Sequence, residues 1–155
     1  LRDLPPRTVA YVRVLDPYRE GVVEDAYGRL VDWAEARGLA DGQWLGYMWE
    51  DPEIVALEDC RYDAALVVSP DRLPEVTADG GEIGRFDFPA LRVAEVAISG
   101  DLQLEQRALD WLFGTWLPGS GLEPDDQPCF ESWVGRPFAH GLERFELTLQ
   151  LPVAR

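Results

Sequence analysis

The sequence contains few of the residues that build disulfides, metal sites and histidine-based active sites. Among its 155 residues are only two cysteines, Cys60 and Cys129, and one histidine, His140. Two isolated cysteines match neither a disulfide framework nor a zinc-ligand spacing, so we expect both to be reduced thiols. His140 falls in a predicted loop and lacks the partners that a catalytic triad requires. Glycine-rich phosphate loops, GxSxG and HExxH are absent as well, so we expect no cofactor and no metal.

Positive charge is also scarce. The chain has 14 Lys and Arg residues against 29 Asp and Glu residues, which gives a formal net charge of −15. An acidic chain repels phosphate backbones, so we do not expect it to bind nucleic acid directly. No apolar run approaches the ~18 residues of a membrane span and no signal peptide is visible, which predicts a cytoplasmic protein with no membrane partner. The chain begins with Leu1 and its only methionine is Met48, which predicts a fragment or a processed product.

What is present is a globular composition arranged in two similar halves. Hydrophobic residues make up 46% and charged residues 28%, as in an ordinary folded domain. Apolar periodicity predicts, in order, strand 8–14, helix 22–34, strands 44–49, 61–68, 82–88 and 91–98, helix 101–117, and strands 129–134 and 145–151. Residues 70–81, rich in proline, glycine and acidic residues, are the best linker candidate.

Three pairs of segments are similar at an offset of about 84 residues, which predicts an internal duplication. The pairs are 9–12 with 93–96, 44–49 with 129–134, and 62–66 with 145–149. Strand, helix, strand, strand would then occur twice, with pseudo-repeats of about 1–70 and 82–155 in a single domain 1–155. A groove between two such halves is a natural ligand site.

The segment from Pro128 to Gly135 carries the candidate binding carboxylate. It is typical of a short strand, and residues two apart in a strand share a face, so Glu131 and Trp133 point the same way. A buried carboxylate without a partner is costly, so Glu131 in an aromatic pocket would favour a positively charged ligand. A half-exposed strand with Glu131 in water is the alternative that the pattern leaves open.

Four other aromatic residues complete the predicted ligand-binding set. Tyr47 and Trp49 share one face of their strand, Tyr62 begins the next strand, and Trp111 lies off the apolar stripe of the second helix. Aromatic rings with polar tips suit a cleft for flat, partly apolar ligands, and ring faces attract cations. The same residues also fit ordinary core packing, so both roles stay open.

Seven segments, in this order and spacing, resemble the GyrI-like small-molecule-binding family. They are LPPRTVAY at 4–11, LGY at 45–47, DPE at 51–53, RYDA at 61–64, WLPGSG at 116–121, FESW at 130–133 and LPV at 151–153. Members of this family include the effector-binding domains of AraC-type and MerR-type transcription regulators. The resemblance and the duplication together predict an α+β fold. In this fold, duplicated strand-helix-strand-strand units form a curved antiparallel sheet with two main helices and a ligand cleft between the halves.

The resemblance also implies a function. It identifies Glu131 with the pocket glutamate that binds lipophilic cations in drug-sensing members. In that role the chain would bind its ligand without catalysing a reaction. The chain would then be the effector sensor of a transcription regulator whose DNA-binding domain precedes Leu1. One alternative is a stand-alone hydrolase of cyclopropane-type genotoxins that uses Glu131. The other is a gyrase-inhibitor-like module that binds a protein. Trp133 stands where tyrosine is more usual in the family, which removes a hydroxyl and weakens the hydrolase alternative.

Overall fold

The computed structural model describes residues 1–50, 54–69, 71, 83–139, 141 and 144–154. The predicted linker, apart from residue 71, and His140 lie outside these ranges. The strands are β1 (Arg2–Leu4), β2 (Arg7–Leu15), β3 (Trp44–Met48), β4 (Arg61–Val68), β5 (Gly84–Phe88), β6 (Leu91–Gly100), β7 (Cys129–Trp133) and β8 (Phe145–Pro152). The helical segments are α1 (Val22–Ala36), η1 (Leu57–Asp59), α3 (Leu102–Trp111), η3 (Leu112–Trp116) and α4 (Leu117–Ser120).

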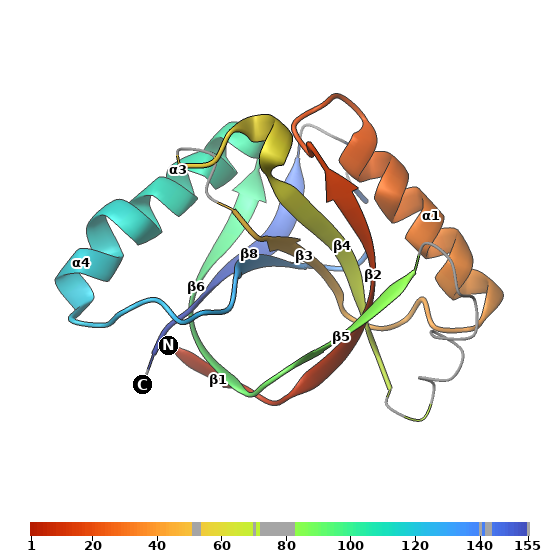
Figure 1. Cartoon of the computed structure of the whole chain (residues 1–155), viewed down its shortest axis with the longest axis horizontal. Helices are drawn as coiled ribbons and strands as arrows, with labels where there is room; N and C mark the ends of the chain where they lie inside the picture. The colour runs from red at the N-terminus through yellow and green to blue at the C-terminus, as the bar shows by residue number, and fades with distance from the viewer. Residues whose placement is uncertain (51–53, 70, 72–82, 140, 142–143, 155) are drawn as a thin grey trace.

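The strands of the described residues form one antiparallel sheet in the order β1-β6-β8-β7-β3-β4-β2-β5. The series β2-α1-β3-β4 recurs as β6-α3-β7-β8, and the two halves of the sheet meet where β3 pairs with β7. The short strands are exchanged, because β1 pairs with β6 and β5 pairs with β2. Figure 1 shows the sheet curling round with α1 and α3 outside the curl. The predicted α+β fold, with its curved antiparallel sheet and two main helices, is therefore confirmed.

Alternate residues along the strands build a core on each face of the sheet. On the face that α1 and α3 cover, here called the helix face, Tyr27 and Leu30 of α1 and Leu112 of η3 pack against side chains of the strands. On the face inside the curl, the inner face, Tyr47 stacks on Phe88 with ring centroids 4.2 Å apart. Each strand therefore presents one set of side chains to the helices and the other to the inside of the curl.

The second helical run begins where the sequence predicts and ends later. Asp101 caps it, with a side-chain oxygen that accepts a hydrogen bond from the Leu104 amide at 3.0 Å. The run passes from α3 through η3, a π-helical segment, into α4 and ends at Gly121, whose φ is 74°. The predicted end at Leu117 is wrong, because Pro118 occupies the first turn of α4. A proline is tolerated at such a position. No helix in the described ranges has the length and apolar character to cross a membrane.

Candidate functional site

Glu131 lies on the helix face of β7 and is only 5% exposed, so a solvated strand carboxylate is excluded. Gly46 of β3 lies directly opposite it in the sheet. The Tyr62 hydroxyl, from β4, donates a hydrogen bond to the Glu131 carboxylate. A Cβ at position 46 would overlap both groups. Gly46 therefore provides the space in which the hydroxyl and the carboxylate meet.

A second carboxylate, Glu105 of α3, is only 3% exposed. Burial, followed by the charge of Glu131 and hydrogen bonding with it, raises the pKa of Glu105 well above its usual range. Sequence analysis missed Glu105, although its spacing from Ala108, Leu109 and Leu112 places it on the apolar stripe of its helix. A single acidic residue on an otherwise apolar helix stripe was the sequence signal that could have identified Glu105 as a site residue.

Tyr27 of α1 connects the other polar groups of the site. Its hydroxyl donates to the Leu45 carbonyl oxygen at 2.8 Å and lies 2.7 Å from the Tyr62 hydroxyl oxygen. The Trp133 indole N–H donates to the Tyr27 hydroxyl at 3.1 Å. Burial, followed by the charge of Glu131, raises the pKa of both Tyr27 and Tyr62 well above the usual tyrosine range. Both phenols are therefore neutral hydrogen-bond donors at physiological pH.

A cleft of about 760 Å³ lies between the helical run α3–η3 and the strands β3 and β7. Gln106 and Leu109 of α3 and Phe113 of η3 line one side, and Met48 and Cys129 lie on the strand side. Met48 pairs with Cys129 in the sheet, and on the same face the next pair along is Gly46 with Glu131. Two residues along a strand span about 7 Å. The cleft therefore leads toward the carboxylates.

Glu131, Trp133 and Tyr62 are the predicted site residues that the structure brings together. All three lie on the helix face, and the hydroxyl of Tyr27 joins Trp133 to Tyr62. Strand alternation correctly predicted that Glu131 and Trp133 share a face. Their roles in ligand binding stay predictions.

The remaining predicted residues, Tyr47, Trp49 and Trp111, lie apart from this cluster. Tyr47 belongs to the inner-face core, and Trp49 packs against that core while also bordering the cleft. Trp111 is 47% exposed on α3 and does not line the cleft. Phe113, two residues later, lines it instead. Strand pairing and helix rotation, which the sequence pattern alone does not specify, decide these placements.

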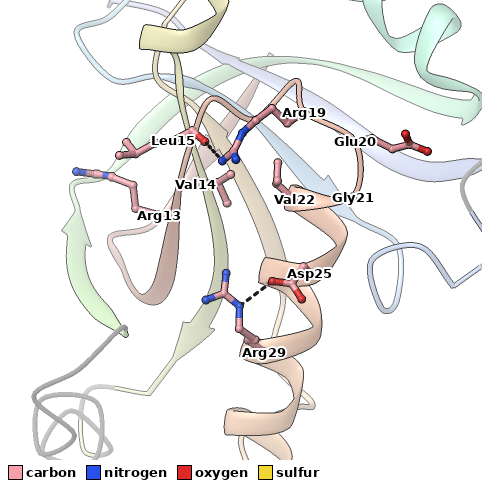
Figure 2. A pocket seen from close by; sticks show the side chains of 9 residues that line it. All are labelled: Arg13, Val14, Leu15, Arg19, Glu20, Gly21, Val22, Asp25 and Arg29. Carbon is pink, nitrogen blue, oxygen red and sulfur yellow. Dashed lines mark hydrogen bonds and ion pairs between the residues drawn. The ribbon is translucent and has the colours of Figure 1, made fainter.

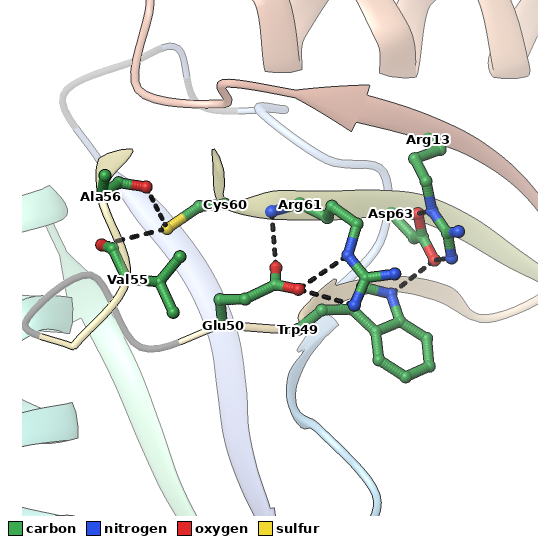
Figure 3. A network of polar contacts seen from close by, with 8 residues as sticks. All are labelled: Arg13, Trp49, Glu50, Val55, Ala56, Cys60, Arg61 and Asp63. Carbon is green, nitrogen blue, oxygen red and sulfur yellow. Dashed lines mark hydrogen bonds and ion pairs between the residues drawn. The ribbon is translucent and has the colours of Figure 1, made fainter. Parts of the chain in front are cut away.

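Charged groups hold Trp49 in place, as Figure 3 shows. Its indole N–H donates to Asp63 at 2.6 Å, and the guanidinium groups of Arg13 and Arg61 both lie over its ring. Asp63 is 3% exposed and also accepts two hydrogen bonds from Arg13, at 2.9 and 3.0 Å. Arg61 in turn pairs with Glu50 at the rim of the cleft. This network fixes one wall of the site.

A second hollow, of about 430 Å³, lies between the end of β2 and the start of α1 (Figure 2). Its arginines contact the chain itself: Arg19 donates to the Leu15 carbonyl oxygen at 3.1 Å, and Arg29 pairs with Asp25 at 3.2 Å. The buried carboxylates are elsewhere, so we place the candidate site in the larger cleft. Within the described part of the chain, no cluster of Cys, His, Asp and Glu side chains could hold a metal ion.

Two buried tyrosines, Tyr27 and Tyr47, offer a matched test of the hydrogen bond between the Trp133 indole and the Tyr27 hydroxyl. We expect Tyr27→Phe to lower the free energy of unfolding by about 2 kcal/mol, because the indole of Trp133 loses its buried acceptor. The Tyr47 hydroxyl is buried without a hydrogen-bond partner among the described residues. Tyr47→Phe should therefore be neutral or stabilising by up to about 1 kcal/mol. Urea unfolding followed by fluorescence checks both, and equal losses would contradict the assignment.

Comparisons with known proteins agree with this architecture. The family model of the GyrI-like small molecule binding domain matches residues 1–154. The chain is 32% identical over 162 residues to a DNA gyrase inhibitor of Edwardsiella piscicida, with 100% of this chain and 97% of that protein covered. Two solved structures share the fold: the C-terminal domain of EcmrR and SAV2435 bound to tetraphenylphosphonium. The first has a TM-score of 0.68 at 15% identity, covering 99% of this chain and 95% of that one. The second has a TM-score of 0.64 at 11% identity, covering 99% and 92%.

Proposed function

Because this chain belongs to the GyrI-like small molecule binding domain family, we propose that it binds lipophilic cations in the cleft beside Glu131. The observation that carries the proposal is a buried acidic pair without a positive partner. In the ranges that the structure describes, no arginine forms an ion pair with Glu105 or Glu131. Buried negative charge is costly unless a cation offsets it.

The cleft also suits the apolar body of such a ligand. Its volume of about 760 Å³ falls within the range of small-molecule sites. Met48 supplies a flexible, polarisable wall that adapts to ligand shape. Phe113 is partly exposed and supplies a ring, and the face of such a ring attracts a cation. A ligand with a charged end near Glu131 and aromatic groups in the cleft would use all of these features.

The effector-sensor role is part of the same proposal. Its support is the fold shared with the C-terminal domain of EcmrR, and a ligand that binds one conformation better would shift the population toward it. A second candidate is a gyrase-inhibitor-like protein-binding module, favoured by the relative named DNA gyrase inhibitor and by the net charge of −15. In that case, binding would depend on salt and not on Glu131. The hydrolase alternative would require measurable turnover of a strained electrophile.

The test is a tryptophan-fluorescence titration with tetraphenylphosphonium and with neutral triphenylphosphine oxide. We expect the wild-type protein to prefer the cation by about ten-fold or more, equivalent to about 1.4 kcal/mol. Glu131→Gln should lose this preference. Asp32→Asn removes one charge at an exposed position of α1 and should keep the preference. Equal affinity for both probes, or an unchanged preference in Glu131→Gln, would count against the proposal. Salt-sensitive binding to DNA gyrase without cation binding would favour the protein-binding module.

A further inference from the structure

An arginine on the inner face of the sheet has no carboxylate partner among the described residues. Arg7, at the start of β2, is only partly exposed, and its Nη2 atom is buried without a hydrogen-bond partner in the described ranges. The ion pairs of these ranges do not include Arg7. Its guanidinium lies instead over the Phe130 ring, 5.4 Å from the ring centroid. Because arginine stays protonated in proteins, a positive charge is held here against an aromatic ring alone.

A second unsatisfied group, the Tyr47 hydroxyl, lies in the same aromatic cluster. Tyr47 of β3 is only 1% exposed, and its hydroxyl is buried without a hydrogen-bond partner among the described residues. Its ring lies 5.1 Å from that of Phe130 and stacks on Phe88, and Phe88 is the residue that pairs with Arg7 in the sheet. Burial raises the pKa of Tyr47, and the charge of Arg7 opposes this rise. Arg7 and Tyr47 therefore share the same two aromatic neighbours.

The carboxylates nearest to them on the inner face have other partners. Asp63 belongs to the network that holds Trp49 (Figure 3). Strand alternation also places Glu95 of β6 on this face, and it accepts a hydrogen bond from Gln150 at 2.8 Å. The chain carries about twice as many acidic as basic residues, yet neither of these two carboxylates pairs with Arg7.

We propose that Arg7 and Tyr47 form an anion site on the inner face of the sheet, which binds the carboxylate group of a small ligand. A guanidinium has only N–H donors and a phenol hydroxyl can donate as well, so the group that satisfies both must supply acceptor atoms. A carboxylate supplies two acceptor oxygens and the negative charge that Arg7 lacks, and hydrogen bonds between charged groups are the strong ones. The rings of Phe88 and Phe130 beside the site suit an apolar body on the same ligand.

This site is separate from the cation cleft. Tyr47 and Phe130 belong to the inner-face core, whereas their chain neighbours Gly46 and Glu131 form the site on the helix face. The proposal therefore does not rest on the proposed function. Glu131→Gln should leave carboxylate binding unchanged, and a failure of cation binding would not affect it.

The binding experiment is urea unfolding of the whole chain with acetate or benzoate, each compared with its neutral amide at constant ionic strength. A ligand that binds only the folded state raises the folding equilibrium constant, by about ten-fold at ten times its Kd. We expect at least one carboxylate, and neither amide, to do so. Arg7→Gln should lose the effect, and Arg107→Gln, which removes a charge at an exposed position of α3, should keep it. No carboxylate effect, an equal effect of the amide, or an unchanged effect in Arg7→Gln would overturn the proposal and leave the two groups to internal water.

Two further variants test the roles of the two side chains. Tyr47→Phe removes one donor and should weaken carboxylate binding by about ten-fold, so an unchanged affinity would overturn the proposal. A charge inside the protein without a counter-charge is costly, so Arg7→Met should fold at least as well as the wild type in buffer without carboxylates. A folding equilibrium constant lowered about ten-fold or more in Arg7→Met would show that Arg7 serves the fold itself, which also overturns the proposal.

Discussion

Gly46→Ala is expected to lower the free energy of unfolding by about 3 kcal/mol and to abolish cation binding, because overpacking a buried site adds to the cost of a broken hydrogen bond. The added methyl group would occupy the position where the Tyr62 hydroxyl meets the Glu131 carboxylate. Both side chains are buried, and neither can retreat without leaving a polar group unsatisfied. Urea unfolding gives the stability, and the tetraphenylphosphonium titration gives the binding.

Gly28→Ala is the matched control for this change. Gly28 is exposed in the middle of α1, and an added Cβ there meets nothing within 4 Å. Alanine favours a helix more than glycine does, so this variant should gain about 0.5–1 kcal/mol. If Gly46→Ala proved as stable as the wild type, Tyr62 and Glu131 would not meet above Gly46, and the geometry of the site would be wrong.

Asp63→Ala should cost about 3 kcal/mol, because removing one partner of a buried ion pair leaves the other uncompensated. Asp63 accepts hydrogen bonds from Arg13 and Trp49, and both donors lose their partner in the variant. The Arg13 side chain is 35% exposed and can turn toward water. The expected loss of stability therefore lies at the lower end of the range for breaking a buried ion pair. Urea unfolding measures this loss, and Trp49 fluorescence reports the loosened wall.

A second arginine–carboxylate contact gives the control for Asp63→Ala. Asp87 pairs with Arg85 at 3.0 Å and accepts a hydrogen bond from Thr8 at 2.8 Å, but its side chain is 59% exposed. Exposed pairs contribute little because water and salt screen them. Asp87→Ala should therefore leave the unfolding transition nearly unchanged. Similar losses in the two variants would mean that burial does not set the strength of the Asp63 network.

The strands and helices could be predicted because their periodicities are local. Strand alternation alone placed Glu131 and Trp133 on one face, and apolar periodicity predicted that the second helix begins at about residue 101. The resemblance to a known family predicted the curved antiparallel sheet. Division of the chain into two pseudo-repeats within one domain stays a prediction, as do the cytoplasmic location and the effector role.

The centre of the site could not be predicted because it depends on contacts between distant segments. The pairing of β3 with β7 brings Gly46 opposite Glu131, and no local pattern fixes that register. The rotation of α3 decides that Glu105 points inward while Trp111 stays exposed. Tyr47 shows the same limit. Strand alternation predicted that Tyr47 shares a face with Trp49, but it could not predict that the carboxylates lie on the opposite face of the sheet.

The exchange of β1 and β5 between the halves of the sheet has a mechanical consequence. Each half supplies an edge strand to the other, so the halves are interlocked rather than joined by a hinge. Separating them would break two rows of backbone hydrogen bonds besides the central β3–β7 row. The chain should therefore unfold as one cooperative unit. The helices on the helix face would then adapt the site to ligands of different size, because their side chains can shift without disrupting the sheet.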